Sequence, residues 1–121
     1  MSLAWQQRYA QQLCSPAEAI RRISPGRRIF VGSGAAEPAT LVEALVKHGE
    51  HLADNEVLHI LTLGPAPYVA PGLERRFRHV AFCIGDNVRQ AVQEGRADFV
   101  PVFLSDIPRL IASGREKIDV A

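Results

Sequence analysis

The stretch GSGAAEP, residues 32–38, joins a short apolar segment to a helical pattern and is the part of the sequence best suited to hold a ligand. Gly32 and Gly34 lack a β-carbon, so the backbone there can adopt positive φ angles and approach a ligand closely. A turn from a strand into a helix also exposes backbone N–H groups at the positive end of the helix dipole. The turn can therefore hold an anion or a polarised carbonyl, while a tight turn without any ligand is the alternative.

Well-known phosphate and nucleophile motifs do not match this turn. A dinucleotide fingerprint, G-x-G-x-x-G, would need a third glycine where Glu37 stands, and the strand predicted at 57–63 ends without an acidic residue to hold a ribose. The sequence has no Gly-Lys-Ser/Thr triplet of a P-loop. The order G-S-G around Ser33 also differs from the G-x-S-x-G of a nucleophile elbow. The match to an NAD-binding oxidoreductase fragment is therefore weak, and we rank that interpretation last of three.

A second strand-to-helix turn, GDNVR at residues 85–89, adds polar groups on the same presumed edge of the sheet. We expect Asp86 to cap the following helix. Asn87 and Arg89 are candidates for contact with a ligand. Glu37 lies in the first turn, but an acidic residue before a first-turn proline also suits the helix dipole, so we do not assign it as a nucleophile.

The local patterns predict the elements that position these turns. Ser15, Pro16 and Glu18 form a capping-box pattern that predicts a helix over 16–23. Apolar spacing predicts a helix from 38 to 48, with an extension to 53 as an alternative. Short apolar runs between turn residues predict strands. The other predicted elements are strands in RIFV, 57–63, 79–84 and 97–103, helices in NVRQAVQEG and 105–114, and a strand beginning in IDVA.

Alternating strands and helices indicate an α/β fold with a parallel sheet. A length of 121 residues fits one domain. We divide it into an N-terminal extension or helix at 1–14 and a domain at 15–121. Because a parallel strand needs neighbours and IDVA is the end of the sequence, we expect the domain to be incomplete at its C-terminal end, as a piece of a longer protein.

The composition argues against several classes of partner. The 14 Lys and Arg residues nearly balance 13 Asp and Glu residues, which argues against nucleic acid and anionic membranes. No signal-peptide or membrane-spanning pattern is present in the sequence, so we expect a cytoplasmic protein. Cys14 and Cys83 lie far apart, and Cys83 falls in the apolar run VAFCI, which predicts a buried, inert thiol. We expect neither a disulfide nor a metal site, and the four histidines show no triad pattern.

The sequence resembles the acetyl-CoA hydrolase/transferase family, which includes 4-hydroxybutyrate and acetate CoA-transferases. The likeness covers residues 15–121. Four segments carry it: SPAEAIRRISPGRRIFVGSGAAEPATLVEAL, TLGPAPY, FRHVAFCIGDNVRQAVQEGRADFVPVFLSDIP and KIDVA. The combination of GRADFVP with LSDIP is specific, whereas the glycine turn alone is weak.

The resemblance implies a CoA-transferase-like parallel-sheet fold and transfer of CoA from an acyl-CoA to a small carboxylate, or thioester hydrolysis. In this family a glutamate forms an anhydride and then a glutamyl-CoA thioester. That glutamate belongs to a second domain, which is absent here, so we assign no catalytic residue to this chain and expect it to be inactive alone. CoA is a substrate, with no covalently bound cofactor. The partners are that C-terminal domain and, in one arrangement, a second copy of the chain.

The resemblance also implies that Gly32, Gly34 and Pro38 form part of a cleft wall that faces the acyl group. Asn87 and Arg89 are further candidates for substrate contact at this wall. The alternative is a free-standing, non-catalytic α/β module that binds a small ligand or a partner chain.

Overall fold

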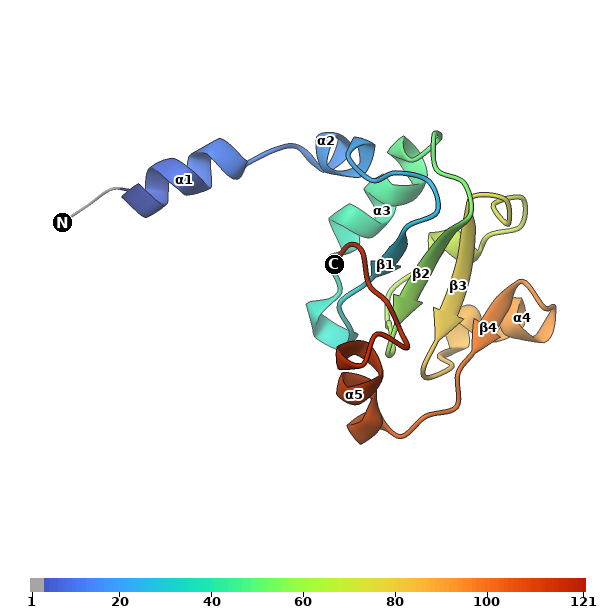
Figure 1. Ribbon diagram of the computed structural model, residues 1–121. Helices are drawn as coiled ribbons and strands as arrows, with labels where there is room; N and C mark the ends of the chain where they lie inside the picture. The colour runs from blue at the N-terminus through green and yellow to red at the C-terminus, as the bar shows by residue number, and fades with distance from the viewer. Residues whose placement is uncertain (1–3) are drawn as a thin grey trace.

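The computed structural model describes residues 4–121, and a four-stranded parallel sheet lies at its centre (Figure 1). The strands β1 (Arg28–Phe30), β2 (Asn55–His59), β3 (Phe77–Ala81) and β4 (Ala97–Phe99) lie side by side in chain order. Near the C-terminus, Val120 forms an isolated parallel bridge with Ile29 on the free edge of β1. The predicted α/β fold with a parallel sheet is confirmed, and IDVA contributes this bridge.

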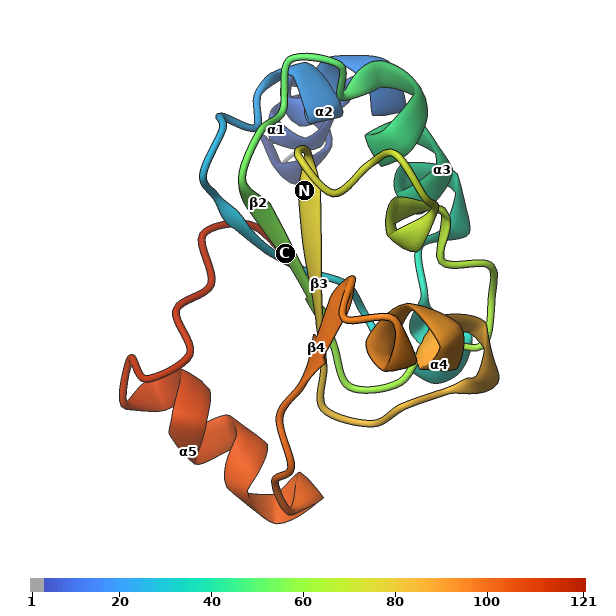
Figure 2. The same ribbon diagram turned by 90° about the vertical axis from the view of Figure 1, so that its right-hand side faces the viewer.

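Helices cover the two faces of the sheet unequally (Figure 2). One face carries α2 (Pro16–Arg21), α3 (Ala39–His48), the 3₁₀ turn η2 (Pro67–Val69) and α4 (Asp86–Gln93). The other face carries α5 (Ile107–Ala112), which follows the 3₁₀ turn η3 (Leu104–Asp106). The first face buries the larger apolar cluster, which includes Ile29, Val57, Leu45, Phe77 and Val88. Burial of these side chains is the main stabilising term of the fold.

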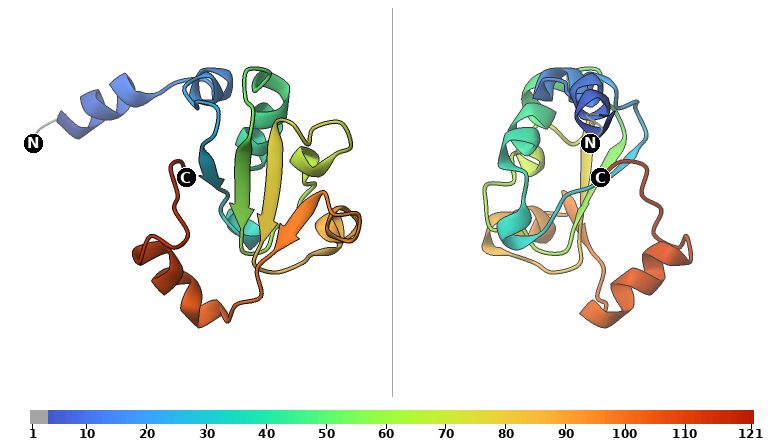
Figure 3. Two further views of the ribbon diagram at one scale, coloured as in Figure 1. Left: turned by 45° about the vertical axis from the view of Figure 1, so that its right-hand side comes forward. Right: turned by 90° about the vertical axis from the view of Figure 1, so that its left-hand side faces the viewer.

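The first helix, α1 (Ala4–Gln12), has no buried residue and extends away from the sheet (Figures 1 and 3). It lies within the segment predicted as an N-terminal extension or helix. A helix with no buried face gains little from tertiary packing. The compact part of the structure therefore begins with α2.

Several predicted boundaries are wrong because local pattern does not determine where a ladder ends. The second and third strands begin at Asn55 and Phe77 and end at His59 and Ala81, well before the predicted ends at 63 and 84. The fourth strand ends at Phe99, before 103. The predicted helix 16–23 ends at Arg21, the extension of α3 to 53 is not present, and the predicted helix at 105–114 divides into η3 and α5. Beyond these points the backbone turns into the loops that carry the candidate site.

The prediction of a buried thiol at Cys83 is also wrong. β3 ends at Ala81, so Cys83 lies in the loop that follows rather than in the apolar strand. Both Cys83 and Cys14 are free and exposed. The two cysteines therefore lie on different parts of the surface: Cys83 beside the sheet edge and Cys14 between α1 and α2.

The predicted capping box at the start of α2 is confirmed. The Glu18 amide donates to Ser15 Oγ at 3.3 Å, and the Ser15 amide donates to Glu18 Oε2 at 2.8 Å. We expect Ser15→Ala to lower the free energy of unfolding by about 1 kcal/mol, because a free helix amide loses its acceptor. Urea denaturation measures this, with the exposed Ser105→Ala as the control. Equal stability of the two variants would contradict the prediction.

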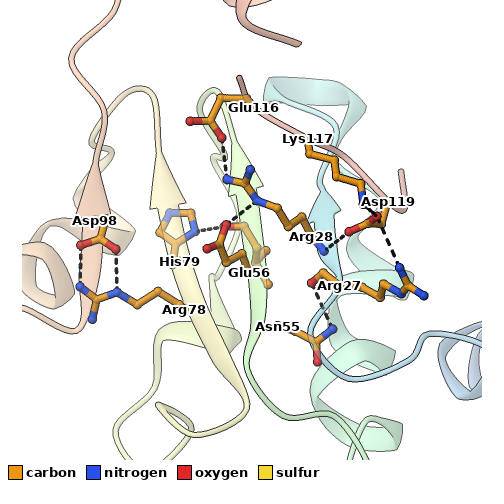
Figure 4. Close-up of polar contacts among 11 residues, drawn as sticks. Arg27, Arg28, Asn55, Glu56, Arg78, His79, Asp98, Glu116, Lys117 and Asp119 are labelled. Carbon is orange, nitrogen blue, oxygen red and sulfur yellow. Dashed lines mark hydrogen bonds and ion pairs between the residues drawn. The ribbon is translucent and has the colours of Figure 1, made fainter. Parts of the chain in front are cut away.

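Charged side chains line the half of the second face that α5 leaves open (Figure 4). Arg28 contacts Glu56 at 2.5 Å and Glu116 at 2.6 Å, which ties the segment after α5 to the start of β1 and β2. Arg78 contacts Asp98 through two nitrogens, at 2.5 and 2.7 Å. The bidentate contact from Arg78 lowers the pKa of Asp98. These pairs hold strand ends that no helix covers.

Candidate functional site

The candidate site is the carboxyl edge of the sheet, which we define by the three loops 32–38, 60–66 and 82–87 that follow β1, β2 and β3. Ligands of open α/β sheets collect at this edge. The first two loops are joined directly: the Gly34 amide donates to the Leu61 carbonyl at 2.8 Å, and Ser33 Oγ accepts from the Ile60 amide at 3.2 Å. The glycine turn is therefore fastened to its neighbour.

Glu37 holds the second loop at a further point. Its Oε2 accepts a hydrogen bond from the Gly64 amide at 3.0 Å. A β-carbon on Gly64 would lie 3.0 Å from this same oxygen, so the close contact favours glycine. The carboxylate of Glu37 thus fastens the two loops together.

Asn87 fastens the third loop to the second. Its Nδ2 donates to the Gly64 carbonyl at 2.6 Å and to the carbonyl and Oγ1 of Thr62, both at 3.2 Å. A β-carbon on Gly85 would lie 2.7 Å from Asn87 Oδ1. The Asn87 amide nitrogen is therefore engaged by protein acceptors rather than directed at solvent. Gly64 is held on both sides, by Glu37 at its N–H and by Asn87 at its carbonyl.

The expectation that Asp86 caps α4 is wrong. Asp86 is the first residue of that helix, the N-cap is Gly85, and no side chain makes the cap bond. The carboxylate lies in solvent, where it contacts Arg89 at 3.0 Å, and a negative charge in the first turn still suits the helix dipole. Arg89 is exposed and held by Asp86, so it lies apart from the network that Asn87 joins.

The glycine turn brings three predicted site residues, Gly32, Gly34 and Pro38, to the carboxyl edge. Each of them has a different conformation or surroundings. Gly34 has a φ of +59°, which favours glycine. A β-carbon on Gly32 would lie 2.9 Å from the Ala36 carbonyl oxygen, and Pro38 is the exposed N-cap of α3. Within residues 4–121 the amides of Gly32 and Ser33 donate to no protein acceptor, whereas that of Gly34 is used. The Ala35 amide likewise has no protein acceptor within this range, so these three amides are the free donors of the turn.

Exposed apolar side chains border the same edge. Leu63, in the loop after β2, is 74% exposed, and Phe103, in the segment after β4, is 80% exposed. Phe99 at the end of β4 is half-exposed, and Cys83 is also exposed. The arrangement offers backbone donors for an oxygen together with apolar surface for an alkyl group.

Sequence reasoning missed three buried polar residues beneath the loops, namely His59, His79 and Tyr68. They are at most 1% exposed. Burial lowers the pKa of His59 to about 3 and that of His79 to about 4, and it raises the pKa of Tyr68 to about 12. A signal was present, because His59 and His79 share the inward-facing alternation of Val57 along the strands.

Within residues 4–121, no group of three or more His, Cys, Asp or Glu side chains has an arrangement that could hold a metal ion. None of the helices in this range is long and apolar enough to cross a membrane.

The chain is similar to a known family of domains and to several CoA transferases. Residues 2–121 match the family model described as the acetyl-CoA hydrolase/transferase N-terminal domain. The chain is 34% identical over 119 residues to the 4-hydroxybutyrate coenzyme A transferase of Clostridium kluyveri, covering 98% of the chain and 28% of that protein. It is 38% identical over 101 residues to a succinyl-CoA:acetate/propanoyl-CoA:succinate CoA transferase of Fasciola hepatica, covering 82% of the chain and 21% of that protein.

Solved structures give the same result. The 4-hydroxybutyrate CoA-transferase of Porphyromonas gingivalis superimposes with a TM-score of 0.72 at 26% identity, over 97% of this chain and 25% of that one. A mutant of RipA superimposes with a TM-score of 0.84 at 25% identity, over 94% of this chain and 28% of that one. The chain thus spans roughly a quarter of the length of the relatives it matches.

Proposed function

Because the chain belongs to the acetyl-CoA hydrolase/transferase family, we propose that it is the N-terminal domain of an enzyme that transfers CoA from an acyl-CoA to a carboxylate or hydrolyses the thioester. CoA enters as a substrate and a small carboxylate as the acceptor. The relatives named above are CoA transferases, which supports this substrate class. The cytoplasmic location and the homo-oligomer stay predictions from the sequence.

In this proposal the carboxyl edge forms one wall of the acyl-CoA cleft. The observation that carries it is the fastening of three loops by Ser33, Glu37 and Asn87, which leaves the amides of Gly32 and Ser33 for a ligand. Rigidly held donors stabilise an oxygen that gains negative charge, because they need no reorganisation during the reaction. Leu63 and Phe103 add exposed apolar side chains in the segments that follow β2 and β4.

The covalent step belongs to a glutamate outside this chain. That carboxylate attacks the thioester carbonyl and expels the CoA thiolate, which gives an anhydride. The thiolate then attacks the glutamyl carbonyl and releases the acyl carboxylate, which leaves a glutamyl-CoA thioester. One oxygen of Glu37 is engaged by the Gly64 amide in fastening the loops, and we assign Glu37 no part in the attack.

A chimera tests this function. The chain replaces the matching 28% of the C. kluyveri transferase, and CoA transfer from acetyl-CoA to 4-hydroxybutyrate is measured. We expect transfer well above the level of the C. kluyveri C-terminal part alone, with the intact C. kluyveri enzyme as the reference. A folded chimera at the baseline level would contradict the proposal and favour the non-catalytic binding module.

A further inference from the structure

Three buried polar side chains, His59, His79 and Tyr68, contact one another between the sheet and η2. The Nε2 atoms of His59 and His79 are 3.1 Å apart, and the Tyr68 hydroxyl oxygen lies 3.3 Å from His59 Nδ1. The two imidazole rings meet edge to face, with their centroids 4.2 Å apart. Each residue is at most 1% exposed, so each polar atom must find its partner within the protein.

The carbonyl of Val57 determines where the protons lie. His79 Nδ1 is 2.8 Å from this oxygen, which can only accept, so Nδ1 carries the proton. Burial keeps His79 neutral at neutral pH, and its Nε2 is therefore an acceptor. His59 must then donate from Nε2, and its Nδ1 accepts from the Tyr68 hydroxyl.

The same series of hydrogen bonds continues to the loop 60–66. The Thr62 side chain, which is 1% exposed, interacts with the Tyr68 hydroxyl and favours its ionised form, as a donating hydroxyl does. Thr62 Oγ1 accepts in turn from Asn87 Nδ2 at 3.2 Å. We call this series the buried relay: it runs from Asn87 through Thr62, Tyr68, His59 and His79 to the Val57 carbonyl. With the Thr62 hydroxyl donating to Tyr68, the donor directions agree along the whole series, so no donor meets a donor.

We propose that Tyr68, His59 and His79 are positioning residues for the cleft wall, because the relay fixes the Thr62 hydroxyl and through it the loop that carries Leu63 and Gly64. This role of the loop rests on the proposed function, whereas the relay itself does not. Apolar side chains of similar size would fill the same space without needing partners. A directed set of hydrogen bonds instead ties the loop to β2 and β3 in one orientation.

The proton positions are measured in the full chain by long-range ¹H–¹⁵N correlation of the imidazole rings near neutral pH. We expect His79 as the Nδ1–H tautomer and His59 as the Nε2–H tautomer, both neutral. His48, for which no such bond is present in the structure, serves as the internal reference. Finding His79 as the Nε2–H tautomer, or either ring charged, would overturn the relay.

Removal of one hydroxyl tests the positioning role. In Tyr68→Phe we expect the Gly64 amide to exchange with solvent about three- to tenfold faster than in the wild type, relative to the Val57 amide of the sheet. Tyr9→Phe, at a tyrosine that is 61% exposed, is the matched control. A Gly64 amide that keeps its wild-type rate relative to Val57 would overturn the proposal.

Thr62→Val provides a second variant, with the exposed Thr40→Val as its control. We expect the Gly64 amide to exchange faster in this variant as well. Thr62→Val therefore tests the proposal even if Tyr68→Phe does not fold. In both relay variants the acetyl-CoA concentration that half-protects Cys83 from alkylation should also rise, by about three- to tenfold. If acetyl-CoA does not protect Cys83 in a chimera that transfers CoA, the proposed cleft wall fails, and the tautomers and exchange rates still decide the relay.

Discussion

A change from about pH 7 to about pH 5 is expected to lower the free energy of unfolding by about 3 to 4 kcal/mol. The cause is the buried pair of His59 and His79, whose pKa values lie near 3 and 4 in the folded chain against 6.5 in the unfolded chain. At a pH between the folded and the unfolded pKa values, the unfolded state binds up to two more protons than the folded state. Stability therefore rises with pH across this window and is lost as the pH falls below about 6.5.

Nearby charges do not change this sign. Asp98 favours the charged form of His79, but burial outweighs it. Burial, with a smaller contribution from Glu37, raises the pKa of Tyr68 to about 12, far above the window. Hydrogen bonds from Ser15 and Arg78 lower the pKa values of Glu18 and Asp98 below 4.5 and 3.8. The stability that such carboxylates add is lost only at more acidic pH, so the loss down to about pH 5 belongs to the histidine pair.

Urea denaturation at the two pH values measures the effect. His79→Asn should lose about half of the pH dependence, because one imidazole then remains. His48→Asn, at a histidine outside the buried pair, should keep all of it. Equal stability of the wild type at both pH values would contradict the buried, neutral state of the pair.

Asn87→Asp is expected to lower the free energy of unfolding by about 2 to 4 kcal/mol, although the two side chains have the same shape. The substitution puts an acceptor or a buried charge where Nδ2 now donates to Thr62 and Gly64. The Gly64 carbonyl at 2.6 Å and the Thr62 carbonyl would both face an oxygen. The new carboxyl group should respond with a pKa raised above its ordinary value.

Thermal and urea unfolding of Asn87→Asp and of Gln93→Glu separate this effect from a simple change of charge. Gln93 lies on the same helix and is exposed, so its variant should change stability by about 0.5 kcal/mol or less. The two curves would coincide if Asn87 merely occupied the surface. A loss confined to Asn87→Asp supports its role in fastening the loops.

Local signals predicted the parts of the fold that depend on neighbouring residues in the sequence. Ser15 and Glu18 are three residues apart, so their capping box could be read directly and was confirmed. The four strands were found along the chain because their apolar runs are short and separated by turn residues. Their ends were misplaced because a ladder stops where its partner strand stops, which depends on the register between chain segments.

The candidate site was predicted only in outline for the same reason. The glycine turn could be found, but the partner of Glu37 is Gly64, 27 residues away. Asn87 looked like a residue that contacts a ligand, yet its amide is used by Thr62 and Gly64. Asp86 looked like a cap because residue type alone does not fix which residue begins a helix.

The alternation of His59 and His79 with apolar residues was the one signal in the sequence of a contact between distant segments. Both lie at inward-facing positions of adjacent strands, two rows apart in register. A buried pair follows from this alternation once the strands are placed side by side. Their proton order does not, because it is determined by the Val57 carbonyl and by Tyr68 from the loop.

Alkylation of the two exposed cysteines tests whether the carboxyl edge is the wall that faces acyl-CoA. Cys83 lies on this edge, whereas Cys14 lies between α1 and α2 and serves as the control within the same chain. Acetyl-CoA has no free thiol, so it does not consume the reagent. In the chimera, saturating acetyl-CoA is expected to slow iodoacetamide labelling of Cys83 and to leave that of Cys14 unchanged. Unchanged labelling of Cys83 in a chimera that transfers CoA would show that the cleft lies elsewhere.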